Sequence, residues 1–192
     1  MRGLNGFLIE PKGERYNNIK KIGDKELILN AEISNFEFLN REGIVKATPL
    51  AFETDIRKGD TVIVHHNVFR RWYNIKKEEK NSSSFIDEDN YIVYEDQIFA
   101  YKRNDEWKAM EGFCFIKPLK ETGMLNTNTE KLMGVVKHTD GIVEKNSLVR
   151  FKPVGQYEFI VDGERLYRVK SNLITLKYEY QGDEEEYNPS WA

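Results

Sequence analysis

The sequence predicts an all-β protein made of two small β-barrels in tandem. Three observations carry this prediction. The apolar residues fall in short β-branched and aromatic runs, few of them recur at the three- and four-residue spacing of a helix, and the chain contains an internal repeat. With 192 residues, 40% hydrophobic and 12% aromatic, the chain has enough apolar material for a packed core, which excludes a wholly disordered protein.

The strands are predicted from runs of the length that β-strands have, most of them bounded by turn-forming residues. The clearest runs are residues 61–64 (TVIV), 91–94 (YIVY), 97–101 (QIFAY), 113–116 (FCFI) and 157–161 (YEFIV). Asp162 and Gly163 follow the last run and predict a tight hairpin, because glycine readily adopts the positive φ that such turns need. Lys58, Gly59 and Asp60 form a similar turn signal before residue 61.

The internal repeat consists of segments that match in the same order. The matching pairs are residues 6–11 with 112–118 (one residue longer), 43–48 (GIVKAT) with 134–139 (GVVKHT), 58–64 with 145–151, and, without gaps, 85–100 with 159–174. Any one match is weak, but four in order predict two copies of one β-module.

The repeat also predicts the domain organisation. The first module covers residues 1–104 and the second covers residues 112–180, and an acidic tail, residues 181–192, lies outside both. The first copy contains a long segment, residues 16–40, where the second has only residues 121–132. The first copy also has a polar insertion, residues 74–84, which we expect to be a mobile surface loop.

Composition excludes several classes of protein. The 29 basic and 32 acidic residues give a net charge of −3, which argues against a nucleic-acid binder. The single cysteine, Cys114, excludes an intrachain disulfide framework and a cysteine-based zinc site, and its apolar surroundings predict a buried small hydrophobe. No apolar stretch approaches the about 20 residues that cross a bilayer, and none near the N-terminus suits a signal peptide. We therefore expect a cytoplasmic protein with no membrane partner.

No residues suit catalysis, a cofactor or a metal. His65 and His66 follow a predicted strand, where neighbouring side chains point to opposite faces, and His138 has no partner in the sequence. Residues 87–89 (DED) read as a solvated turn. Phosphate-binding glycine motifs and the nucleophile elbow of hydrolases are absent from the sequence. The prediction is a protein that is not an enzyme.

The order of these elements resembles the GroES family of ten-kilodalton co-chaperonins. In the second copy, the resemblance lies in the strand at residues 145–151, the hairpin at 161–167, and residues 169–176, which resemble the closing strand after the family's "ESDILA" stretch. In the first copy, residues 58–64 and 95–100 resemble the same parts. Both GIVK and GVVK resemble the "RGEVLAVG" strand that follows the family's mobile loop, and the likeness spans roughly residues 6–178. Tandem co-chaperonin domains are known from plastids, and diverged GroES-like proteins from viruses.

The resemblance implies a function for residues 16–40. In the family, the matching loop is flexible, and a short aliphatic edge on it inserts into an apolar groove of the chaperonin. Leu27, Ile28 and Leu29 match that edge and would be the chaperonin-binding residues. Burial of three aliphatic side chains outweighs the cost of ordering the loop only slightly, so each loop would bind weakly and an oligomer would add avidity. The alternative is that residues 26–33 form a core strand.

The resemblance thus implies a co-chaperonin that caps a GroEL-type ring and assists unfolded substrate proteins indirectly. It also implies a homo-oligomer, with residues 7–9 of one subunit pairing with residues 173–176 of the next or of the other copy. The sequence departs from the family in its short residues 48–55, where the roof hairpin is expected, in the insertion, and in the short loop of the second copy.

Two other functions remain open on the sequence. One is a non-enzymatic β-barrel that binds another protein, such as a viral structural or assembly factor. The other is a barrel that binds single-stranded nucleic acid through Arg70, Arg71, Trp72 and Tyr73, which interleave charge and aromatic rings.

Overall fold

A computed structural model shows a chain folded into β-strands and describes residues 1–16, 19–23, 25–28, 39–119, 132–154, 157–179 and 182. Within these residues there is no α-helix, only short 3-10 turns such as Glu95–Gln97 and Ser171–Leu173, so the all-β class is confirmed. The chain divides into two compact units, Met1–Glu106 (unit 1) and Trp107–Ala192 (unit 2). The division lies between the two modules that the repeat predicts. Apart from Gly182, the acidic tail lies outside the described residues.

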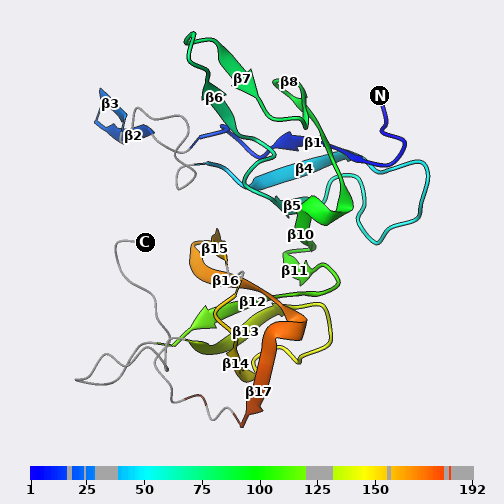
Figure 1. Cartoon of the computed structure of the whole chain (residues 1–192), viewed down its shortest axis with the longest axis vertical. Coiled ribbons are helices and arrows are strands. Elements are labelled where there is room, and N and C mark those ends of the chain that lie inside the picture. The colour runs from blue at the N-terminus through cyan, green and yellow to red at the C-terminus, as the bar shows by residue number, and fades with distance from the viewer. Residues whose placement is uncertain are drawn as a thin grey trace. The chain divides into compact units, whose positions relative to one another are not determined.

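Unit 1 is built on an antiparallel sheet with the strand order β11-β10-β5-β4-β1-β9-β8 (Figure 1). Its strands are β1 (Phe7–Pro11), β4 (Glu42–Ala47), β5 (Thr61–Val64), β8 (Phe85–Asp87), β9 (Asn90–Val93), β10 (Ile98–Arg103) and β11 (Glu106–Ala109), and the division between the units falls within β11. Two separate hairpins join β2 (Ile19–Ile22) to β3 (Lys25–Ile28) and β6 (Arg71–Tyr73) to β7 (Glu79–Asn81).

Unit 2 contains a six-stranded antiparallel sheet with the order β15-β16-β12-β13-β14-β17. Its strands are β12 (Phe113–Pro118), β13 (Met133–Thr139), β14 (Leu148–Phe151), β15 (Tyr157–Val161), β16 (Glu164–Lys170) and β17 (Ile174–Tyr178). Asp162 and Gly163 form the turn between β15 and β16, with φ values of +49° and +81°. The hairpin predicted at these two residues is confirmed.

The two sheets have the same topology. The order β10-β5-β4-β1-β9-β8 in unit 1 corresponds strand for strand to β17-β14-β13-β12-β16-β15 in unit 2. The bulge in the central pair is also repeated, because Lys46 in β4 and Lys137 in β13 are the residues that the pairing skips. A shared bulge at a shared position supports duplication over chance similarity of short strands.

The same six positions form the core of each copy. In unit 2 they are Cys114, Ile116, Val136, Val149, Phe151 and Val169, and in unit 1 the equivalent buried residues are Phe7, Ile9, Val45, Val62, Val64 and Val93. The duplication therefore extends from strand order to packing.

The glycine that opens each repeated GIVK or GVVK element has a packing role. A Cβ on Gly43 would lie 2.5 Å from Cγ2 of Ile9, and a Cβ on Gly134 would lie 2.6 Å from Cγ2 of Ile116. Real Cβ atoms do not approach other atoms so closely, so only glycine fits beside the central strand in either copy.

One part of the predicted repeat alignment is wrong. The gap-free match of residues 85–100 with 159–174 places Tyr91 opposite Arg165. The pairing shows instead that Tyr91, which faces Ile9, corresponds to Tyr167, which faces Ile116. The hairpin of the second copy is longer, and a comparison of short polar turns did not reveal this difference.

The prediction that each module closes into a barrel is not confirmed. Each sheet has two distinct end strands within the described residues. The sequence also predicted that residues 7–9 take part in a contact between subunits or copies. This choice of strand is wrong, because β1, which contains these residues, already pairs with β4 on one side and β9 on the other. No strand lies between Ala47 and Thr61, all of which are described, in agreement with the expected lack of a roof hairpin.

Candidate functional site

The long segment of the first copy, residues 16–40 (the excursion), begins and ends on a closed base. Tyr16 and Leu39 form an isolated antiparallel bridge, and both are buried. The side-chain amide of Asn40 donates to two backbone carbonyl oxygens just before the excursion, at 2.8 and 3.0 Å. The two ends of the excursion are therefore fixed to each other.

Arg15 is the central residue of this base. Its guanidinium is buried and donates to the carbonyl oxygen of Phe69 at 3.1 and 3.2 Å and to Oδ1 of Asn81 at 2.8 Å. It also lies 5.5 Å from the ring centroids of Phe85 and Tyr91. A buried cation needs such partners, because leaving water costs it far more than a neutral group.

The charges around Arg15 are balanced from the surface. The carboxylate of Glu88, which is largely exposed, lies 3.5 Å from the guanidinium. Burial raises the pKa of Tyr91 to about 12, although Arg15 opposes the rise. The tyrosine therefore stays neutral, and Glu88 supplies the negative charge.

The polar insertion is attached to the same base. The hydroxyl of Tyr16 accepts a hydrogen bond from the backbone N–H of Arg71 at 3.1 Å and donates one to its carbonyl at 3.2 Å. Asn81, at the end of β7, binds Arg15. The two segments that distinguish the first copy are thus anchored at the same base. The sequence did not predict this, because the bonded residues are 55 and 66 positions apart.

Residues 74–81 of the insertion form the turn and the second strand of the hairpin β6–β7, and not the mobile loop that the sequence predicted. Strand β6 pairs with β7, with Trp72 opposite Lys80 and Tyr73 opposite Glu79. The guanidinium of Arg70 lies 5.7 Å from the ring of Trp72. Because β7 has the sequence EKN, it carries no apolar signal that could have identified it as a strand.

The predicted chaperonin-binding residues fall on the other hairpin. Leu27 and Ile28 belong to β3, where they pair with Lys20 and Ile19 of β2, and Leu29 lies outside the described residues. The structure thus places the first two in a two-stranded sheet separate from the sheet of unit 1. The role predicted for the three residues remains a prediction.

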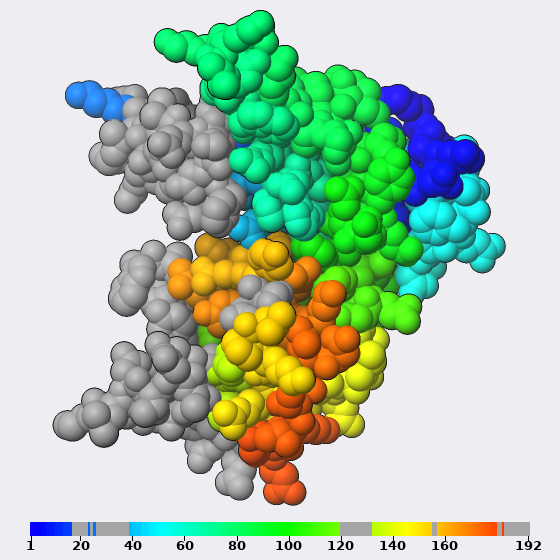
Figure 2. Space-filling view, in the orientation of Figure 1, coloured from blue at the N-terminus to red at the C-terminus, as the bar shows by residue number. Residues whose placement is uncertain are grey.

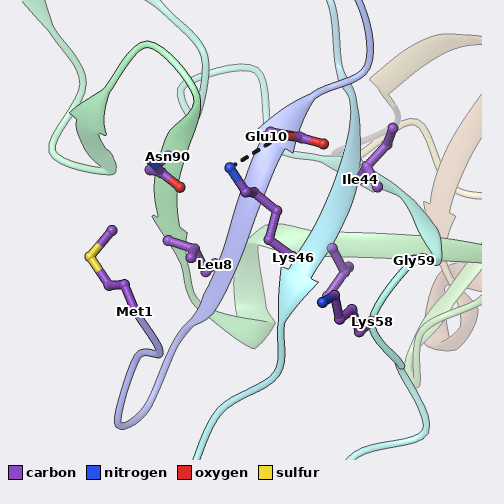
Figure 3. A pocket seen from close by; sticks show the side chains of 9 residues that line it. Met1, Leu8, Glu10, Ile44, Lys46, Lys58, Gly59 and Asn90 are labelled. Carbon is purple, nitrogen blue, oxygen red and sulfur yellow. Dashed lines mark ion pairs between the residues drawn. The ribbon is translucent and has the colours of Figure 1, made fainter.

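A hollow of about 660 Å³ lies on unit 1, and Lys46 and Glu10 form an ion pair of 3.3 Å in it (Figure 3). The residues lining it include Met1, Leu8, Glu10, Ile44, Lys46, Lys58, Gly59 and Asn90. In the second copy, Phe115 and Leu166 take the positions of Leu8 and Asn90, and Phe159 packs on Phe115 with a centroid distance of 5.8 Å. The hollow offers apolar side chains and one ion pair, which suit packing better than catalysis.

Cys114 is buried, as predicted, and belongs to a structural cluster. Its sulfur lies 3.3 Å from Oγ of Ser171, which donates to Oδ2 of Asp140 at 2.7 Å. Burial raises the pKa of the Cys114 thiol, so the sulfur keeps its proton and is a poor nucleophile. The cluster fastens the loop at Asp140 to the sheet.

His65 and His66 do not point to opposite faces, as the sequence suggested. They follow β5 in a turn, and their rings lie 4.1 Å apart with an angle of 31°. Burial, followed by the nearby charges of His65, Arg41 and Arg70, lowers the pKa of His66 to about 4. Among the residues that the structure describes, no group of three or more histidine, cysteine or acidic side chains is placed to hold a metal ion.

No protein-family model matches the chain, and no curated protein matches it. In the described part of the chain, no helix is both long and apolar enough to cross a membrane.

Proposed function

We propose that this protein is a duplicated co-chaperonin that binds a GroEL-type chaperonin ring through the excursion of its first copy. The observation that carries the proposal is the closed base at Arg15, Tyr16, Leu39 and Asn40, which supports an inserted segment on an otherwise duplicated sheet. The order of strands, in which the two copies agree, is also the feature on which the resemblance to the GroES family depends.

The base gives a physical reason for such a function. A binding segment must be held at its ends and yet leave the scaffold unaffected when it binds and releases. Because Tyr16 and Leu39 bridge one another, strain in the excursion would be taken up at the base and not in β1 or β4. The proposal includes no catalytic step. The protein would act as a homo-oligomeric lid in the cytoplasm, and its several weak contacts would add up.

The test is capture by a purified GroEL-type chaperonin with ATP. Serine at Leu27, Ile28 and Leu29 together is expected to reduce capture at least tenfold, about 1.4 kcal/mol per binding event. The matched control places serine at three exposed aliphatic residues elsewhere, Leu50, Ile142 and Val154.

Circular dichroism shows whether each variant is folded. Loss of capture with a native spectrum supports the proposal. Unfolding of the excursion variant alone means that residues 26–33 are core, and absence of capture by the unchanged protein contradicts the co-chaperonin function. The proposal of a different protein partner then takes its place.

A further inference from the structure

The tip of the β6–β7 hairpin is held in one conformation. Oδ1 of Asn74 accepts hydrogen bonds from the backbone N–H groups of Lys76 and Glu78 at 2.9 and 3.0 Å, and Nδ2 of Asn74 donates to the Glu78 carboxylate at 2.8 Å. The backbone also closes the turn, from Lys77 to Asn74 at 2.9 Å and from Asn74 to Glu78 at 3.0 Å. Lys77 adopts a positive φ of 62°. Five hydrogen bonds in so short a turn define its shape.

This ordered tip presents an apolar side chain to solvent. Ile75 is fully exposed, and Tyr73 and Trp72 beside it are exposed by 53% and 37%. Figure 2 shows the hairpin protruding from unit 1. Since the turn is already ordered, a partner that buried Ile75 would not have to meet the entropy cost of ordering it.

The hairpin is also basic in an acidic chain. Residues 70–81 contain five basic side chains (Arg70, Arg71, Lys76, Lys77 and Lys80) and two acidic ones (Glu78 and Glu79), a formal charge of +3, whereas the whole chain carries −3. A positive patch around an apolar anchor complements an acidic surface that contains an apolar depression.

The hairpin and the excursion leave unit 1 from the same base at Arg15 and Tyr16. We propose that the β6–β7 hairpin is a second docking element, which binds an acidic surface on the same protein that the excursion engages and inserts Ile75 into it. This inference rests on the proposed function, because it takes that protein to be the chaperonin ring.

The geometry favours a protein partner over single-stranded nucleic acid. Trp72 and Tyr73 are neighbours on one strand, so their rings point to opposite faces and form no continuous stacking platform. The guanidinium of Arg70 lies over the ring of Trp72, and the Tyr73 hydroxyl binds the Glu79 carboxylate at 3.4 Å, which places a negative charge where a phosphate would approach. Ile75 would have no function in stacking.

The test measures the affinity of the full chain for a purified GroEL-type ring with ATP, at low and high salt. Ile75→Ser is expected to weaken binding about tenfold, or about 1.4 kcal/mol. Its matched control is Ile142→Ser, which makes the same change at an exposed isoleucine of the second copy. Lys76→Gln combined with Lys77→Asn is expected to reduce the salt dependence of binding, whereas Lys145→Gln with Lys152→Asn is not.

The outcomes separate the two proposals. If the unchanged protein binds the ring and both hairpin variants bind equally well with the same salt dependence, the hairpin is no docking element and the excursion alone acts. If the unchanged protein does not bind, the co-chaperonin function fails and the inference with it. Salt-dependent binding of a labelled oligothymidine that the hairpin variants abolish would make the hairpin a nucleic-acid site and overturn the inference.

Discussion

At two core positions, the copies differ in opposite directions: one copy has the larger side chain at the first position and the other copy has it at the second. In the first copy, Phe7 and Val64 are both core residues, and the equivalent residues in the second copy are Cys114 and Phe151. All four are buried, so a loss of volume at one position accompanies a gain at the other. Cores tolerate such exchanges when their total volume is kept. The difference between a phenylalanine and a cysteine therefore does not argue against the repeat.

The turn before β5 gives a prediction at a single residue. Gly59 has a φ of +92°, and the equivalent residue of the second copy, Asn146, has +64°. Because asparagine tolerates this region and a β-branched residue does not, Gly59→Asn should leave stability almost unchanged, while Gly59→Val should cost about 1–2 kcal/mol. Urea unfolding of the two variants measures the difference, and equal losses would mean that φ is not the cause.

His66 predicts a dependence of stability on pH. Burial lowers its pKa to about 4 in the folded protein, below the ordinary value of 6.5. Between pH 4 and pH 6.5, His66 therefore binds a proton more readily in the unfolded chain than in the folded protein. The free energy of unfolding is unaffected by this titration above pH 6.5 and decreases as the pH falls toward 4.

His66→Asn removes this titration, and its loss of stability between pH 7 and pH 4.5 should be smaller than that of the unchanged protein. Chemical unfolding at the two pH values tests this. An identical loss in both proteins would mean that His66 contributes nothing to the pH dependence.

At the scale of elements, the strands with strong apolar signals agree best with their prediction. Residues 61–64 and 157–161 were predicted as strands and form β5 and β15 with the same bounds. β7, by contrast, is a strand because it pairs with β6 across the Asn74 turn, and its own residues are polar. Local sequence identifies strands that bury side chains, but it does not identify strands that form only through their hydrogen-bonded partner.

Arg15 connects these elements, and its replacement tests the shared base. Arg15→Gln removes the bonds to the Phe69 carbonyl and to Asn81 and is expected to cost about 1–3 kcal/mol, since it leaves buried polar groups without their partner. Amide exchange should quicken most in β6 and β7, because Asn81 at the end of β7 loses its hydrogen bond to Arg15.

The control is Arg2→Gln, at an exposed arginine whose hydrogen bonds to Thr48 are 3.4 and 3.5 Å long. It should change neither stability nor exchange. If Arg15→Gln behaved in the same way, the guanidinium would not hold the two segments together.

At the scale of the whole molecule, a duplicated scaffold carries two additions on its first copy. Among the described residues, six strands of each unit have the same order, and the first copy adds the two hairpins β2–β3 and β6–β7. The sheet of unit 1 also has β11 at one edge. The equivalent of β10 in the second copy is β17, and β17 is itself the edge strand of its sheet, with no counterpart of β11 beside it among the described residues. The scaffold and its additions should therefore be separable.

Replacement of residues 17–38 by a four-residue Gly-Ser linker tests this separation. The Tyr16–Leu39 bridge and the Asn40 hydrogen bonds lie at the two ends of the excursion, so they close the base without residues 17–38. We expect a folded protein, stabilised by about 1 kcal/mol because a shorter loop loses less entropy on closure, that no longer binds the chaperonin. Thermal unfolding and chaperonin capture measure the two effects, and a chain that failed to fold would show that the excursion belongs to the core.

The sequence by itself determined the all-β class, the duplication, most strands that bury apolar residues and the turn at Asp162 and Gly163. These features depend on side-chain periodicity and on backbone preferences, which act over a few residues. The tertiary structure decided the open sheets, the register that places Tyr91 with Tyr167, and the meeting of the excursion with the β6–β7 hairpin at Arg15. Those features depend on which strands pair and on hydrogen bonds between residues far apart in the chain, and no local pattern encodes such partners.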